Sequence, residues 1–180
     1  HGDNQDAISR MGGIPLLVGL LGTGGLEVQA MASMALCEVS RAHPDNQSAI
    51  AEQGGLSTLV MLLRHASSAA SDASSASASA PMPSSAFSCA ADEYDSARAA
   101  SFECIRVETA GALWVLAESN EANKVSIASS GGLAPLAQLL ASGGSRGREH
   151  ATNALAHLTM GNTDNQSQVT SLLVAFLGPG

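Results

Sequence analysis

The sequence predicts an all-helical solenoid in which short helical repeats stack in a row. Four asparagines, Asn4, Asn46, Asn123 and Asn165, open segments of similar pattern and stand 42, 77 and 42 residues apart. Each of the first three segments contains a glycine pair followed by an apolar octet. Each also carries an alanine-rich stretch with apolar residues at helical spacing. Periods of this length are typical of stacked helical repeats, which bury their apolar faces against their neighbours.

The first segment is predicted to form three helices. A short helix over residues 4–11 ends at Gly12-Gly13, because glycine tolerates positive φ. Pro15 suits the first turn of a second helix over residues 14–21, since a helix start leaves its N–H groups unpaired and proline has none to lose. A longer third helix follows over about residues 27–41.

The second segment repeats this pattern and then contains an insertion, because its spacing of 77 exceeds 42 by 35 residues. In residues 66–80 only Asp72 is neither serine nor alanine. This composition buries too little apolar surface to offset its chain entropy, so we predict disorder over about residues 66–90. We expect Asp92 to cap the third helix of this repeat, which then runs to Ala117.

The third segment has the glycine pair Gly131-Gly132, a hinge proline at Pro135 and a third helix predicted over residues 149–160. The last segment is apolar over residues 171–176 but has no glycine pair. It is either a truncated fourth copy or a short helix that covers the exposed end of the core.

The chain is therefore predicted to be a single repeat domain, residues 1–180, of about three copies and a partial fourth. The predicted boundaries are about 4–45, 46–122, 123–164 and 165–180. Because the chain begins at His1, we expect it to be an excerpt of a longer array. Fewer than about four copies make a solenoid marginally stable, so neighbouring repeats or a dimer partner are expected.

Composition excludes several classes of function. The chain has 16 acidic against 8 basic residues and only 3% aromatic residues, so it lacks the positive field and stacking surfaces that nucleic-acid binding needs. It has no run of 18 apolar residues and no leader sequence, so neither a membrane span nor a signal peptide is predicted. Cys37, Cys89 and Cys104 match no disulfide or metal pattern. We expect reduced thiols and a cytoplasmic protein, with nuclear and ciliary locations as alternatives.

No residues are predicted to be catalytic or to bind a metal or a cofactor. His150 and His157 lie seven residues apart on one side of a helix, but two ligands do not complete a metal site. The glycine-rich turns lack the Gly-Lys-Ser/Thr sequence of a phosphate loop, and no Ser/His/Asp set can be assembled. Trp114 is interpreted as packing against a neighbouring repeat, with an exposed binding anchor as the alternative.

The order of a short helix, Gly-Gly-Ile-Pro-Leu-Leu-Val-Gly-Leu-Leu at residues 12–21 and a third helix carrying Ala-Leu resembles the armadillo repeat. The resemblance covers the whole chain except the insertion. It implies a right-handed superhelix of three-helix repeats, whose third helices line a groove for extended peptides or partner helices. It also implies core positions at Ala32, Leu36, Val39, Thr109, Leu113, Leu116, Ala151, Leu155 and Leu158.

On this resemblance, positions two before and two after each core leucine face the groove. Gly111 is one of these positions, and Glu108 replaces it in the predicted site, which comprises Met34, Glu38, Glu108, Val115, Asn153 and His157. The tryptophans and asparagines of nuclear-import receptors do not stand at their expected places, and the groove is not basic as in catenins.

The predicted function is that of a non-enzymatic scaffold that binds a protein partner, basic or amphipathic because the groove is acidic. One alternative is the substrate-recognition region of a larger enzyme such as a U-box ubiquitin ligase. Another is a ciliary or membrane docking platform.

Overall fold

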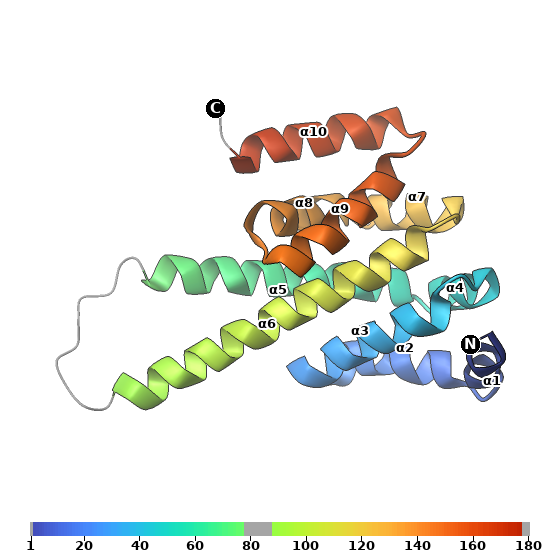
Figure 1. Cartoon of the computed structure of the whole chain (residues 1–180), viewed down its shortest axis with the longest axis horizontal. Helices are drawn as coiled ribbons and strands as arrows, with labels where there is room; N and C mark the ends of the chain where they lie inside the picture. The colour runs from blue at the N-terminus through green and yellow to red at the C-terminus, as the bar shows by residue number, and fades with distance from the viewer. Residues whose placement is uncertain (1, 78–87, 178–180) are drawn as a thin grey trace.

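The computed structural model describes residues 2–77 and 88–177, and the side-chain surroundings of residues 2–70 and 96–176. Within these ranges the chain forms ten α-helices and no strand (Figure 1). The helices are α1 (Gly2–Arg10), α2 (Gly13–Thr23), α3 (Leu26–Ser40), α4 (Pro44–Glu52), α5 (Gly55–Ser77), α6 (Ser88–Ala117), α7 (Glu121–Ser129), α8 (Leu133–Ser142), α9 (Ser145–Thr159) and α10 (Thr163–Leu177).

The first nine helices form three stacked triplets, each made of a short helix, a second helix and a longer third helix. The third helices α3, α6 and α9 lie side by side, and the second helices α2, α5 and α8 form the layer behind them (Figure 1). Each third helix packs against the third helix of the next triplet. This arrangement confirms the predicted all-α solenoid.

The glycine pair makes the sharp turn between the first and second helix of each repeat. In the third repeat, α7 and α8 meet at 82°. Gly131 has φ of 82°, which favours glycine. A Cβ on Gly132 would lie 2.8 Å from Ile127 Cγ2 and 2.9 Å from the Ile127 carbonyl oxygen. The first glycine therefore supplies the left-handed backbone, and the second allows the two helices to approach closely.

The asparagines that recur along the sequence tie each first helix to the third helix of the preceding repeat. Asn46 Nδ2 donates to the Val39 carbonyl at 2.9 Å, and Asn165 Nδ2 donates to the Leu158 carbonyl at 2.8 Å. Asn123 Nδ2 makes the same bond to Leu116, at 2.9 Å. Because the last carbonyls of a helix have no partner within it, these buried amides satisfy groups that would otherwise be unpaired.

The second residue after each third helix has a left-handed backbone. Gly161 does so with φ of 74°, and Ala42 and Ser119 do so with φ of 54° and 56°. Ala42 and Ser119 are exposed. These two side chains are therefore held in a conformation that costs an L-residue about 1 to 2 kcal/mol.

We expect Ser119→Gly to raise the free energy of unfolding by about 0.5 to 1 kcal/mol, because relief of this strain exceeds the freedom that glycine adds to the unfolded chain. Urea denaturation followed by circular dichroism measures the change. Gly161→Ala is the matched reverse substitution and should lower the unfolding free energy. A loss of stability in Ser119→Gly would contradict the strain at this position.

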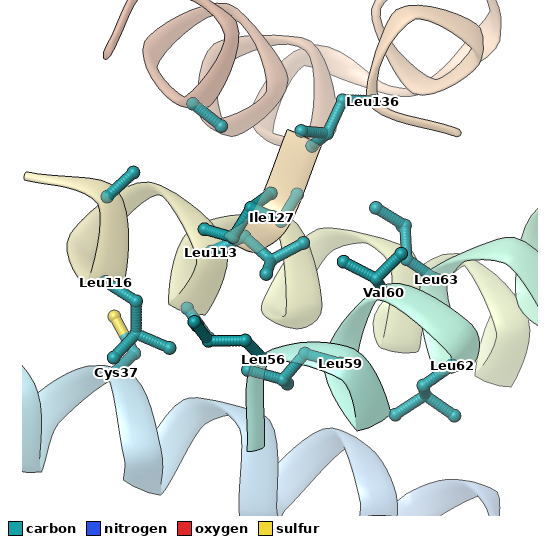
Figure 2. Close-up of a cluster of buried hydrophobic side chains, with 14 of the residues drawn as sticks. Cys37, Leu56, Leu59, Val60, Leu62, Leu63, Leu113, Leu116, Ile127 and Leu136 are labelled. Atoms are coloured by element: carbon teal, nitrogen blue, oxygen red, sulfur yellow. The ribbon is translucent and has the colours of Figure 1, made fainter. Parts of the chain in front are cut away.

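All nine predicted core positions are buried. Figure 2 shows the centre of the core, where Leu113 of α6, Ile127 of α7 and Leu136 of α8 gather beside the leucines of α5. The one polar member, Thr109, has its hydroxyl 3.3 Å from the Ser33 hydroxyl. Helical spacing and repeat register therefore predicted the core correctly.

The prediction of disorder over residues 66–90 is wrong where the structure describes this segment. Residues 66–77 continue α5, and residues 88–90 begin α6; residues 78–87 lie outside the described residues. Alanine is the strongest helix former, and Ala66 and Ser67 at the start of this segment are buried, so α5 continues and forms a helical hairpin with α6. The hairpin extends sideways beyond α3 and α9 (Figure 1).

Two predicted helix starts are also wrong. Asp92 lies inside α6 and not at its cap, because the helix already begins at Ser88. The third helix of the third repeat begins at Ser145, four residues before its predicted start. Gly147 is buried there, and a Cβ on it would lie 3.0 Å from Leu139 Cδ1. Residues that look like a flexible turn are thus the first turn of α9.

The last segment forms one continuous helix, α10, which lies across α8 and α9 at the end of the solenoid (Figure 1). Val169 is buried, and Leu172 and Leu173 pack against the core. Because no glycine pair interrupts this segment, the helix continues straight where the earlier repeats turn. Helix α10 therefore covers this end of the core, where each earlier repeat begins with two helices.

The opposite end, formed by α2 and α3, exposes apolar side chains. Leu20 and Val28 are exposed, whereas their counterparts in the later repeats are all buried: Leu62, Ile105, Leu139 and Gly147. A cavity of about 420 Å³ opens here and is lined by Leu17, Leu20, Glu27, Val28, Met31, Ala32 and Ala35. In the second and third repeats, this face is covered by the repeat before them. In the first repeat the same face is exposed.

In the described part of the chain no single helix is long and apolar enough to cross a membrane. Helices α7 and α8 reach such a length and composition only when the two are counted together across their bend.

Candidate functional site

A pocket of about 320 Å³ opens where the three third helices lie side by side. We call it the α3–α6–α9 pocket. Its lining residues come from all three helices and from the residue that follows α3: Met34, Ala35, Cys37, Glu38, Arg41, Glu108, Gly111, Trp114, Arg146 and His150. The solenoid therefore builds this site from side chains more than 100 residues apart in the sequence.

Three of the six predicted site residues line this pocket: Met34, Glu38 and Glu108. Asn153 and His157 are half-buried on α9 and do not line it. Gly111, which the spacing rule indicated and the predicted site left out, does line it.

Val115 was predicted to face the groove, and this is wrong because its side chain is 0% exposed. Helix α6 lies between α3 and α9, which cover both of its flanks. The strip of α6 that reaches the pocket carries Glu108, Gly111 and Trp114. On a middle helix, the position two residues after the core leucine therefore turns into the interface with a neighbouring helix.

Sequence reasoning did not place Cys37, Arg41, Trp114, Arg146 or His150 in the site. One signal could have found Trp114, since it stands three residues after Gly111 and so lies on the same helical face. The contribution of Arg146 could not be found this way, because it depends on how α9 lies against α6.

Two ion pairs form opposite walls of the pocket. On α3, Glu38 Oε1 accepts from Arg41 Nη2 at 2.9 Å, and both side chains are exposed. Between α6 and α9, Glu108 pairs with Arg146 through two contacts, Nη1–Oε1 at 3.0 Å and Nη2–Oε2 at 3.3 Å. Each wall therefore presents one carboxylate together with one guanidinium.

The floor between these walls is mainly apolar. Met34 and Cys37 come from α3, and the ring of Trp114 comes from α6. Burial raises the pKa of the Cys37 thiol to about 11, so the thiol stays protonated at neutral pH. Since the thiolate is the nucleophilic form, Cys37 serves as an apolar surface here and not as a reactive group.

His150 is held against α6 in a defined orientation. Its Nδ1 lies 2.9 Å from the Val107 carbonyl, which can only accept, so Nδ1 carries the proton and Nε2 is an acceptor in the neutral ring. A Cβ on Gly111 would lie 2.8 Å from this Nδ1, so glycine makes room for the ring. The indole ring of Trp114 lies next to the imidazole ring of His150, and the centroids of the two rings are 6.0 Å apart.

The Trp114 Nε1–H is buried and has no hydrogen-bond partner among the described residues. In the same part of the chain, no group of three histidine, cysteine or acidic side chains gathers as metal ligands would. The arrangement offers apolar surface, two paired carboxylates and the oriented ring of His150. Such a surface can hold a segment of another chain by contacts with both its side chains and its backbone.

The sequence matches no protein-family model and no curated protein. Solved structures do match. A designed armadillo repeat protein in complex with the peptide (KR)4 has a TM-score of 0.68 at 18% identity, over 98% of this chain and 60% of that one. An engineered protein solved by a structural genomics consortium has a TM-score of 0.63 at 21% identity, over 91% of this chain and 54% of that one.

This chain thus spans little more than half the length of these two proteins, and the matches run through nearly all of its own length. These structural matches identify the architecture, together with the triplets of helices, the glycine-pair turns and the aligned third helices. The chain has the fold of an armadillo repeat array.

Proposed function

We propose that this chain is a non-enzymatic scaffold that binds a segment of a partner protein along the α3–α6–α9 pocket. The observation that carries the proposal is the pocket itself, which crosses all three third helices and combines an apolar floor with charged walls. A segment lying across the third helices would contact each repeat in turn. The designed armadillo repeat protein of the same fold, which was solved with a bound peptide, supports this use.

We further propose that the partner segment is basic. The chain carries a net charge of −8, and the pocket holds two carboxylates, Glu38 and Glu108, each paired with an arginine. A negative field attracts basic partners and disfavours acidic ones. The peptide bound by the structural neighbour is composed of lysine and arginine, which is consistent with this partner class.

The test is fluorescence anisotropy of a labelled octapeptide of alternating lysine and arginine, titrated with the whole chain. We expect the double variant Glu38→Gln, Glu108→Gln to weaken binding about tenfold, because each lost carboxylate removes about 0.7 kcal/mol and the two together about 1.4 kcal/mol. The double variant Glu52→Gln, Asp164→Asn removes the same charge from exposed positions on α4 and α10.

The control should change affinity less than about twofold, since exposed charges farther away than about 8 to 10 Å are largely screened at physiological salt. Equal losses in both double variants would mean that the peptide responds only to net charge. The pocket would then not be its binding site.

A further inference from the structure

We infer that Arg146 is a built-in occupant of a cation subsite formed by Glu108, and that a lysine or arginine of the bound segment displaces it. The inference rests on the proposed function, because it assigns one subsite within the same pocket. It also explains why a pocket proposed to bind basic segments already carries an arginine in its wall.

Glu108 is the fixed member of the pair. Its side chain is only 11% exposed, although it lines the pocket. A carboxylate that has lost most of its water needs a cation beside it, because an unpaired buried charge is strongly unfavourable. The site is therefore made for a positive group at this point.

Arg146 is the exchangeable member. Its side chain is 61% exposed and stands on the second residue of α9, just after the Gly143-Gly144 turn. It reaches Glu108 from the solvent side as a fork of two contacts. A side chain so exposed keeps most of its water, so it can give up its place at the carboxylate to another cation with little change in its own hydration.

A second ion pair, formed within α6, has the opposite construction. Arg106 is 5% exposed, pairs with Glu103 at 3.0 Å and also donates to Ser142 of α8 at 3.1 Å. Glu103 in turn accepts from the Gly144 N–H at 3.0 Å. Here the cation is the buried member, and the network joins α6 to the end of α8 and to the turn before α9. The Arg146 pair lacks this burial of its cation.

The surroundings of Glu108 suit a ligand cation on an alkyl stem. Trp114 and Met34 line the same pocket and offer apolar surface along which the stem of a lysine or arginine can lie. A cation from the ligand would replace the Arg146 guanidinium with an equal charge, so Glu108 would remain paired throughout. The intramolecular pair lowers the affinity for the ligand, because the ligand cation has to displace the Arg146 guanidinium from Glu108.

The experiment measures binding of the alternating lysine and arginine octapeptide by the whole chain and by four variants. We expect Arg146→Ala to bind about two- to fivefold more tightly, the equivalent of losing one competing exposed pair. Arg148→Ala is the matched control, since it removes an equal charge from an exposed residue of the same helix. Its gain should be smaller and should reflect the general field alone.

The remaining variants connect the gain to Glu108. Glu108→Gln should weaken binding, and adding Arg146→Ala to it should restore no more than the small gain that Arg148→Ala gives. Circular dichroism must show equal helicity in all variants. Suppose that the unaltered chain binds the peptide but the Arg146→Ala variant binds no more tightly than the Arg148→Ala variant. The proposal that a ligand cation displaces Arg146 is then wrong, and the proposed function stands. If no form binds the peptide, both are wrong.

Discussion

Leu113→Ala is expected to lower the free energy of unfolding by about 2 to 5 kcal/mol, the largest effect of any single substitution considered for this chain. Leu113 is 0% exposed and lies at the centre of the core, where side chains of α5, α7 and α8 meet α6. Removing three carbons loses their burial and leaves a cavity, which close packing prevents the neighbours from filling completely. Chemical denaturation measures the loss.

Leu16→Ala is the matched control for this prediction, because it makes the same change on α2 where the side chain is 70% exposed. Its expected effect is within about 0.5 kcal/mol. Because stability in a stacked array is shared between neighbouring repeats, the Leu113 variant should also broaden the transition or shift it in two steps. Equal losses in the two variants would show that α6 does not organise the core as described.

Gly132→Ala is expected to cost about 1 to 3 kcal/mol, the range of overpacking in a well-packed site. The added Cβ would meet Ile127 Cγ2 at 2.8 Å, the Ile127 carbonyl at 2.9 Å and Val60 Cγ2 at 3.2 Å. The carbonyl belongs to the backbone of α7 and accepts from the Gly132 N–H at 3.0 Å. Relief therefore requires opening the bend between α7 and α8, which moves α8 against α5.

Gly22→Ala provides the control, since this glycine lies in α2 and a Cβ there would meet nothing within 4 Å. Alanine is favoured over glycine in a helix by about 1 kcal/mol, so this variant should be neutral or more stable. Thermal unfolding of the two variants beside the unaltered chain makes the comparison. A Gly132→Ala variant that melts with the unaltered chain would show that the turn tolerates a wider angle.

The repeat architecture was predictable because one physical solution recurs along the chain. Helical spacing placed Leu36, Leu113 and Leu155 in the core, and each is buried. The glycine pairs marked the turns because few other residues suit a left-handed backbone or a contact this close. The recurring asparagines were visible in the sequence, but their role was not. It depends on a carbonyl seven residues earlier that becomes accessible only when two helices pack.

The error over residues 66–90 arose from treating composition as a local property. Alanine and serine bury little surface in isolation, and on that ground the segment was assigned to disorder. In the structure its first part extends α5, and Ala66 and Ser67 at its start are buried, which composition alone did not indicate. A helix that continues from a stable one also avoids the cost of nucleation.

Which side of α6 stays open was decided by tertiary structure. Val115 and Glu108 both lie on α6, and nothing in their spacing shows that the first is buried and the second reaches a pocket. Exposure on a middle helix depends on where α3 and α9 lie against it. The same holds for Arg146, which meets Glu108 only because α9 packs beside α6.

The sequence alone determined the fold class, the turn positions and the core, because these follow from local periodicity and from the backbone freedom of glycine. The tertiary structure alone decided which charges meet in the α3–α6–α9 pocket and which residues form its floor. These depend on distances between helices of different repeats, and such distances are properties of packing that no single stretch of sequence contains.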